Sequence, residues 1–207
     1  MRIKFYLLCL LFLGFTNAGF SQMTIATKVG ILPHQPTYVY NGVSFHDDQS
    51  SPGLAIALAF RQEIGHRLAL GTELGFNNFT NELDISTLTQ SIVGRHSHQQ
   101  TYLALVPQYS FTKQPGLVFV NAGFLLFMNT RSDLETSSDI KPMNIGSATT
   151  GMFIGIGGNL HIEKLGIQLE IRPTFQDQSL RRVGSPGPDK FKLYYTNIFW
   201  GLTYHFD

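Results

Sequence analysis

Residues 54–76 read LAIALAFRQEIGHRLALGTELGF, and this stretch decides the fold of the 207-residue chain. Large apolar residues alternate with Ala, Gly or charged residues on both sides of the short segment 63–66. Successive side chains of a strand point to opposite faces of a sheet, so each half is a strand with one apolar face and one small or charged face. We predict a hairpin whose strands run over residues 52–62 and 67–77.

Six further stretches alternate in the same way, and the gaps between strands alternate long and short. The other strands are expected over residues 24–32, 100–111, 117–128, 148–162, 167–175 and 192–206. The long gaps are 33–51, 79–99, 129–147 and 176–191, and the short ones are 63–66, 112–116 and 163–166. Outer-membrane barrels have long loops on one rim and short turns on the other. The pattern predicts an all-β, eight-stranded antiparallel up-and-down transmembrane β-barrel, with both mature termini periplasmic.

The two faces of the strands decide between a membrane barrel and a soluble one. A soluble barrel of the lipocalin type would have to pack the Leu, Ile and Val face into a lumen that holds little more than side chains. A membrane barrel turns this face toward lipid and carries aromatic girdles at both interfaces. Aromatic residues do gather at the strand ends: Phe60, Tyr109, Phe111, Tyr204 and Phe206 at one rim, and Phe76, Phe79, Tyr102, Phe175, Tyr194 and Tyr195 at the other.

A turn signal in the first long gap and a proline in each of two predicted strands lead to local expectations. Residues 38–45 contain Asn41-Gly42 between alternating residues, which is typical of a tight hairpin turn. Pro107 and Pro173 lie inside predicted strands, where each removes a ladder donor. We expect a bulge or local fraying at both prolines.

The amino-terminal segment has the pattern of a secretory signal peptide. Arg2 and Lys4 precede an apolar run and a small, polar stretch, so residues 1–21 are expected to be cleaved after about 18–21, leaving 22–207 as the barrel. The only cysteine, Cys9, lies in this segment, so the mature chain has no thiol for a disulfide or a metal. Of the 15 Lys and Arg residues 13 then remain, against 14 Asp and Glu, which provides no basic field for nucleic acid.

Several short segments carry a family resemblance. They are residues 51–54 through 72–75, 101–107, 120–123, 155–158 and 170–172. Together they resemble the small outer-membrane β-barrel domain of porin-family or PorT-like proteins, of the type found in Bacteroidetes. The resemblance implies an eight-stranded barrel in the outer membrane, and a few such relatives are linked to protein secretion.

Charged residues on the inward face are the first candidate site. They are Lys28, Arg61, Glu73, Glu170 and Arg172. Glu73 and Arg172 are expected at similar heights on opposite sides of the lumen, where a paired charge is tolerable and a lone one is costly. We predict a lumen-filling ion network. The alternatives are a proton or ion path and a carboxylate acid/base site.

Polar residues of the long gaps give the remaining candidates. His96-Ser97-His98 and the group His34, His46, Asp47 and Asp48 could serve a metal or a Ser/His hydrolase, but their spacing fixes no third ligand and no triad, so we expect solvated loop residues. Arg181, Arg182, Lys190 and Lys192 form either a solvated rim or a contact with lipopolysaccharide phosphates. No cofactor, metal or catalytic residue is predicted.

These observations favour a structural or interaction barrel. The chain is expected to be a monomeric, non-enzymatic outer-membrane protein in contact with lipid and lipopolysaccharide, with a protein partner in a secretion or envelope complex as a further expectation. The alternatives are a narrow porin-like channel for small solutes and an outer-membrane lipid-modifying enzyme.

Overall fold

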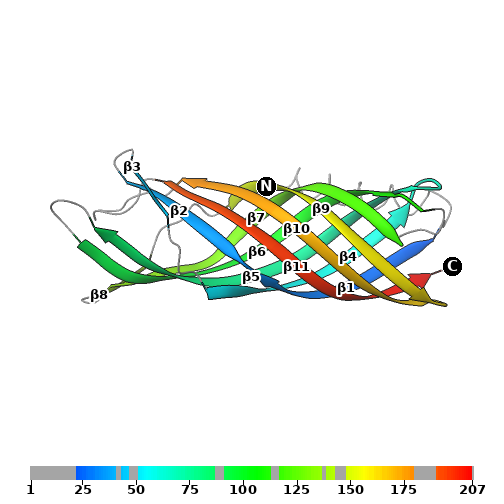
Figure 1. The fold of residues 1–207 in the computed structure, drawn as a ribbon, viewed down its shortest axis with the longest axis horizontal. Coiled ribbons are helices and arrows are strands. Elements are labelled where there is room, and N and C mark those ends of the chain that lie inside the picture. The colour runs from blue at the N-terminus through cyan, green and yellow to red at the C-terminus, as the bar shows by residue number, and fades with distance from the viewer. Residues whose placement is uncertain are drawn as a thin grey trace, which may run out of the picture.

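A closed antiparallel barrel accounts for nearly all regular structure in the described part of the chain (Figure 1). The computed structural model describes residues 22–40, 43–46, 51–86, 91–112, 117–136, 139–142, 148–179 and 190–206. The expected signal peptide lies outside these residues. No helix within them is long and apolar enough to cross a membrane.

Eleven strands occur in the described residues. They are β1 (Met23–Leu32), β2 (His34–Tyr40), β3 (Val43–His46), β4 (Ser51–Glu63), β5 (Leu68–Ser86), β6 (Ser91–Ser110), β7 (Val118–Thr136), β8 (Asp139–Pro142), β9 (Ala148–Ile162), β10 (Leu165–Ser179) and β11 (Lys190–Phe206). Eight of them form the barrel in the order β1-β4-β5-β6-β7-β9-β10-β11, and β11 closes it by pairing with β1. The predicted fold class is confirmed.

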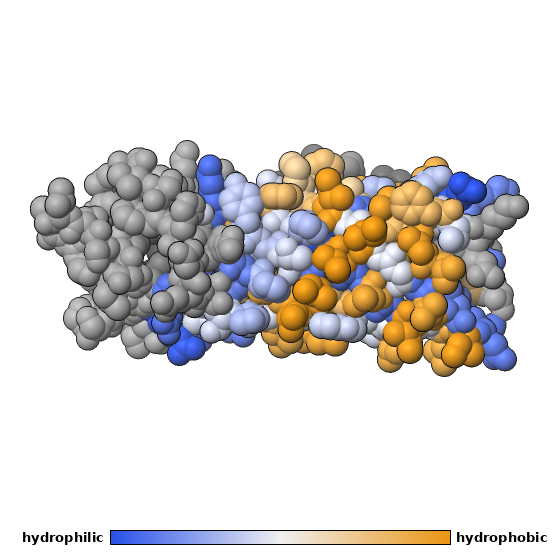
Figure 2. Space-filling model, viewed as in Figure 1, coloured by the Kyte–Doolittle hydropathy of each residue, from blue (hydrophilic) through white to orange (hydrophobic). Residues whose placement is uncertain are grey.

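The two faces of each barrel strand differ as the alternation predicts. Along β1 the burial alternates residue by residue, with Ala26 and Lys28 inside and Val29 outside. Outward apolar side chains remain largely exposed, and Phe124, Leu160 and Ile154 reach 72%, 69% and 66%. We call this exterior band of exposed apolar residues the belt; Figure 2 shows it over β10, β11 and β1. A belt of this kind is stable only against lipid.

The strands of the central sheet are longer than predicted. Residues 79–99 were expected as a loop, but β5 continues to Ser86 and β6 begins at Ser91, with Phe79 opposite His98. In the same way β7 extends to Thr136 and pairs with β8. The expectation of loops here is wrong because the outward residues beyond the belt are polar. Apolar alternation therefore measures the lipid-spanning length, about 9–11 residues, and not the full ladder.

The two ends of the barrel are unlike each other. The short turns lie at the end where Met23 pairs with Phe206, on the right of Figure 1. The strand extensions and the β2–β3 hairpin lie at the opposite end. The expected hairpin of the first long gap is confirmed, since Tyr38 pairs with Phe45 and Tyr40 with Val43, and β2 also pairs with β11.

The two strand prolines are accommodated without a bulge. Pro107 pairs with Leu70 and Pro173 with Thr196, and the register is unchanged on either side of each proline. The ladder to the other neighbour is interrupted, because pairing of β6 with β7 skips residues 106–107 and pairing of β10 with β9 skips 172–173. Each proline thus loses pairing on one side only, which is the fraying alternative and not the bulge.

Candidate functional site

Four charged side chains meet at mid-height in the lumen. Lys28 comes from β1, Glu73 from β5, and Glu170 and Arg172 from β10, and each side chain is at most 1% exposed. We call these four residues the lumen network. Two cations and two anions make it electrically neutral, which is the condition under which charges can be buried together.

Each cation of the lumen network bridges both carboxylates. Lys28 Nζ donates to Glu73 Oε2 at 2.7 Å and to Glu170 Oε2 at 2.8 Å. Arg172 donates two bonds to Glu73, from Nη1 at 2.6 Å and from Nη2 at 3.0 Å. Its Nε and Nη2 also donate to Glu170 Oε1 at 2.9 and 2.7 Å. The paired arginine bonds to Glu73 join β10 to β5 across the lumen, and such bidentate pairs fix geometry as well as charge.

Neutral side chains complete the hydrogen bonding of the carboxylates. Tyr102 donates to Glu73 Oε1 at 2.7 Å, Asn121 to Glu170 Oε1 at 2.7 Å and Gln168 to Glu170 Oε2 at 3.0 Å. All four carboxylate oxygens therefore accept at least two bonds. Acceptors in this state are held as ionised structural groups and have no lone pair aimed at a solute.

Aromatic rings and glycines close the space around the lumen network. The Arg172 guanidinium lies 4.1 Å from the Phe153 ring centroid and 5.3 Å from that of Phe199. Gly75 lies opposite Tyr102, and a Cβ at Gly75 would overlap the tyrosine ring. The missing side chain leaves the room that this ring needs, so the Tyr102 ring fills lumen space beside Glu73.

Arg61 lies apart from the lumen network. Its side chain is inward and 9% exposed, and its guanidinium stands 5.4 Å from the centroid of the Phe119 ring. No carboxylate of the described residues lies within ion-pair distance of it. The structure brings four of the five predicted lumen charges together and leaves the fifth near the short-turn end.

The gap histidines are buried, which corrects the expectation that they are solvated. His34, His96 and His98 are 4%, 1% and 0% exposed. His34 contacts Asn81 through Nε2, and His98 Nε2 lies 3.2 Å from Gln100 Oε1. Strand alternation explains the burial, because His96 and His98 share the inward face of β6. Sequence reasoning missed it because these residues were assigned to a loop.

The surroundings of these histidines argue against a metal or hydrolytic site. Ser97 points outward from the strand while His96 and His98 point inward, so the three do not converge. Among the described residues no group of three or more His, Cys, Asp or Glu side chains is placed to hold a metal ion. The structure describes the backbone of His46 but not its side chain. Asp47 and Asp48 lie outside the described residues.

Burial shifts the protonation of the two β6 histidines. They lie beyond the belt, since the outward residues beside them are the polar Arg95, Ser97 and Gln99. Burial lowers the pKa of His96 to about 3, helped by the neighbouring His98 and His34. It lowers the pKa of His98 to about 4, against the hydrogen bond to Gln100. Both imidazoles are therefore neutral near pH 7.

The predicted lipopolysaccharide contact falls mostly outside the described residues. Arg181 and Arg182 lie there, as does the side chain of Lys190. Lys192 is half-buried on β11 and is paired with Asp177 and Thr37 in the ladders.

Comparisons with known proteins find similar folds and no family. No protein-family model matches the chain, and no curated protein matches it. Similar solved structures include Neisserial surface protein A (11% identity, covering 89% of this chain and 98% of that one, TM-score 0.47). Others are the attachment invasion locus protein Ail of Yersinia pestis in complex with sucrose octasulfate (13%, 90% and 100%, 0.45) and the outer membrane protease OmpT of Escherichia coli (10%, 91% and 98%, 0.48). At these identities and TM-scores they leave the function open.

The closed ladder and the belt decide the class of protein. The chain is an eight-stranded transmembrane β-barrel. Every barrel strand finds a partner on both sides within the belt, apart from the short interruptions at the two prolines, so the backbone polar groups can be satisfied inside lipid.

Proposed function

We propose that the protein is a barrel with a closed lumen that acts through the end bearing the strand extensions, as a structural or interaction partner in the outer membrane. The lumen network carries this proposal. Its side chains are at most 1% exposed and join β1, β5 and β10 across the barrel. An eight-stranded barrel has just the width that side chains can fill, so bulk solute transport is not its role.

The strand extensions support an interaction role. β5, β6 and β7 have 19, 20 and 19 residues, about twice the 9–11 that a bilayer requires. Phe79, Asn81 and His96 pack inside this extension with 0–2% exposure. A packed interior restricts the strands of the extension, and preorganised surfaces bind with less loss of conformational freedom.

The remaining assignments follow from this proposal. The extensions face the cell exterior, both mature termini are periplasmic, and the barrel is a monomer in contact with lipid and lipopolysaccharide. The proposal includes no enzymatic activity; the divergence of the candidate Ser97 and His96 side chains and the saturation of the lumen-network carboxylates with donors support it. Membership of the PorT-like group and a partner in a secretion or envelope complex are part of the proposal and rest on the sequence resemblance.

Conductance in planar bilayers tests the closed lumen. The folded wild-type protein is expected to give no steady single-channel openings. The matched control is the double variant Glu73→Ala with Arg172→Ala, which removes one charge of each sign and leaves the 2.8 Å pair of Lys28 and Glu170. Openings in the double variant alone would show that the assay detects a vacated lumen. Steady openings of the wild type would favour the narrow channel instead.

A hairpin truncation tests the interaction role. Asn81 pairs with His96, so residues 82–95 can be replaced by Asn-Gly without changing the register below that pair. The truncated protein should still insert and show heat-modifiable gel mobility, but should lose partners that the wild type captures by crosslinking in outer membranes. Identical crosslinked partners for both proteins would contradict the proposal.

A further inference from the structure

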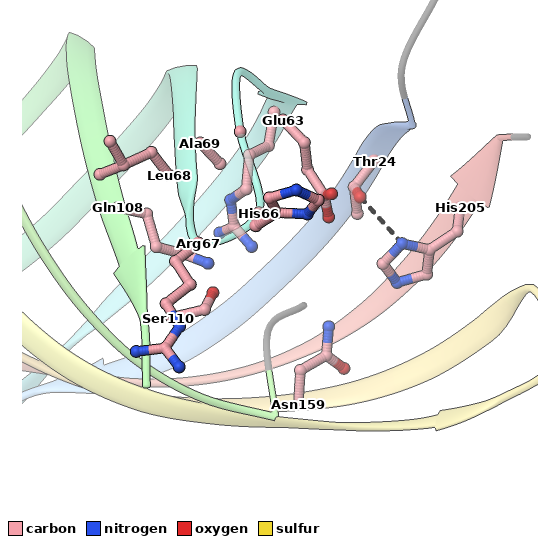
Figure 3. A pocket seen from close by; sticks show the side chains of 12 residues that line it. Thr24, Glu63, His66, Arg67, Leu68, Ala69, Gln108, Ser110, Asn159 and His205 are labelled. Atoms are coloured by element: carbon pink, nitrogen blue, oxygen red, sulfur yellow. Dashed lines mark hydrogen bonds between the residues drawn. The ribbon is translucent and has the colours of Figure 1, made fainter. Parts of the chain in front are cut away.

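A small cavity at the short-turn end contains the buried cation that the lumen network does not use. Arg61 lines it. Glu63, Arg67, Gln108 and His205 also line it, among other residues (Figure 3). We call it the turn-end cavity. Gly65, His66 and Arg67 at its rim are exposed, so the cavity communicates with the solution at this end of the barrel.

The charge balance of the turn-end cavity is positive. Lys28 and Arg172 are neutralised by Glu73 and Glu170, so Arg61 is a buried charge in excess of that balance. At the cavity itself Arg61 and Arg67 stand against Glu63, the only carboxylate among the lining residues. A cation buried without an ion-pair contact is costly, and one further negative charge would neutralise this site.

Two groups of the cavity wall, on Arg61 and His205, can donate to an acceptor in the cavity, whereas Gln108 Oε1 lacks a donor among the described residues. The Arg61 guanidinium makes no hydrogen bond to any described residue, although a guanidinium carries five N–H donors. His205 Nδ1 lies 2.9 Å from Thr24 Oγ1, and its Nε2 has no partner among the described residues. When the Thr24 hydroxyl donates to Nδ1, the proton of the neutral ring is on Nε2, which then serves as a second donor.

The size of the cavity limits the ligand. The space open to the centre of a water molecule is about 10 Å³, which is about the room for a single water. A halide ion or one end of a carboxylate is closer to this size than a tetrahedral sulfate or phosphate is. We propose that the turn-end cavity is a binding site for one small monovalent anion, either a halide or the carboxylate of a partner, held by Arg61 and His205.

Anion titrations of the folded protein in detergent micelles test this proposal. Chloride and formate are each exchanged for sulfate at constant ionic strength and pH, and the thermal unfolding midpoint is recorded. The wild type should show a saturable rise of the midpoint with chloride, formate or both. A response to chloride alone indicates an inorganic ion, and a response to formate indicates a carboxylate. Equal midpoints in all three salts would overturn the proposal.

Two variants with opposite expectations locate the effect. Arg61→Gln should raise the apparent dissociation constant at least tenfold. Glu63→Gln should lower it several-fold, because a like charge leaves the cavity wall; if Glu63 were instead the counter-ion of Arg61, the Glu63→Gln protein would lose stability in every salt and gain no affinity. Arg131→Gln, an exposed position on the extension of β7, is the matched control and should change nothing.

The test does not depend on the folding of one variant. If Arg61→Gln fails to give heat-modifiable mobility, the wild type and Glu63→Gln decide the matter. Unchanged or weaker affinity in Glu63→Gln would then overturn the proposal, as would a saturable rise of normal strength in a folded Arg61→Gln protein.

Discussion

Replacing Glu73 by Gln should be among the most destabilising changes that preserve side-chain shape. Glu73 accepts one bond from Lys28, two from Arg172 and one from Tyr102, all at 2.6–3.0 Å. The substitution removes one charge and leaves the lumen network with a net charge of +1. It also places an amide NH₂ against the donors of Lys28 or Arg172. Breaking a buried ion pair by removing one partner costs about 3–5 kcal/mol, and we expect a loss of this size.

A compensating substitution makes the prediction specific. In the double variant Glu73→Gln with Lys28→Gln, one cation and one anion remain, and Arg172 still has its two bonds to Glu170. Because neutrality is restored, the double variant should be more stable than the sum of the two single losses predicts, by about 1–3 kcal/mol. Urea unfolding in detergent micelles, followed by heat-modifiable gel mobility, measures these free energies. A loss below about 1 kcal/mol for Glu73→Gln would refute the reasoning, because a loss of that size is typical of an exposed ion pair. Strict additivity of the two single losses would refute it as well.

Three further predictions probe the strand extensions, the lumen packing and the belt. The pKa values of His96 and His98 are lowered to about 3 and about 4, against about 6.5 for a histidine of the unfolded chain. The stability that the neutral rings contribute is therefore present above pH 6.5 and is lost as the pH falls from there toward the folded-state pKa values, by about 2–3 kcal/mol per histidine down to pH 4.5. In the double variant His96→Asn with His98→Asn, the free energy of unfolding should depend less on pH than in the wild type. An unchanged pH dependence would argue against buried neutral rings. Gly75→Val should cost about 1–3 kcal/mol through overlap with Tyr102, and Tyr102→Ala should recover part of this loss; no recovery would place the clash elsewhere. Ile156→Arg in the belt should lower the free energy of unfolding of the lipid-reconstituted protein by about 2–4 kcal/mol, whereas Ile156→Ala should lower it much less. Equal losses would show that Ile156 does not face the lipid core.

The part of the fold that faces lipid could be predicted from the sequence because lipid imposes a pattern on it. Apolar residues must stand outward at every second position, so residues 54–62 and 67–77 identify strands without any knowledge of their partners. The same parity places Glu73 and Arg172 inside, where the structure joins them at 2.6 and 3.0 Å. Neutrality of a buried group then restricts which charges can meet.

The strand extensions, the burial of the histidines and the position of Arg61 could not be predicted, because no periodic pattern of apolar residues marks them. Residues 79–86 and 91–99 form a ladder whose outward face is polar, so the alternation ends although the hydrogen bonding continues. The burial of His98 follows from that ladder and has no local signal. The separation of Arg61 from the lumen network depends on its height in the barrel and on the Phe119 ring beside it, which only the register between strands determines.

The boundary between lipid and water therefore does not coincide with the end of the packed lumen. On β6 the outward face becomes polar at Gln99 and Ser97, while the inward face remains buried at His98 and His96. A loop needs no such interior, and burying polar rings is costly unless they are hydrogen-bonded. The interior of the extension is therefore packed and hydrogen-bonded beyond the length that anchoring in the membrane requires. Under the proposed interaction role, this packed interior outside the belt places the functional question with the strand extensions.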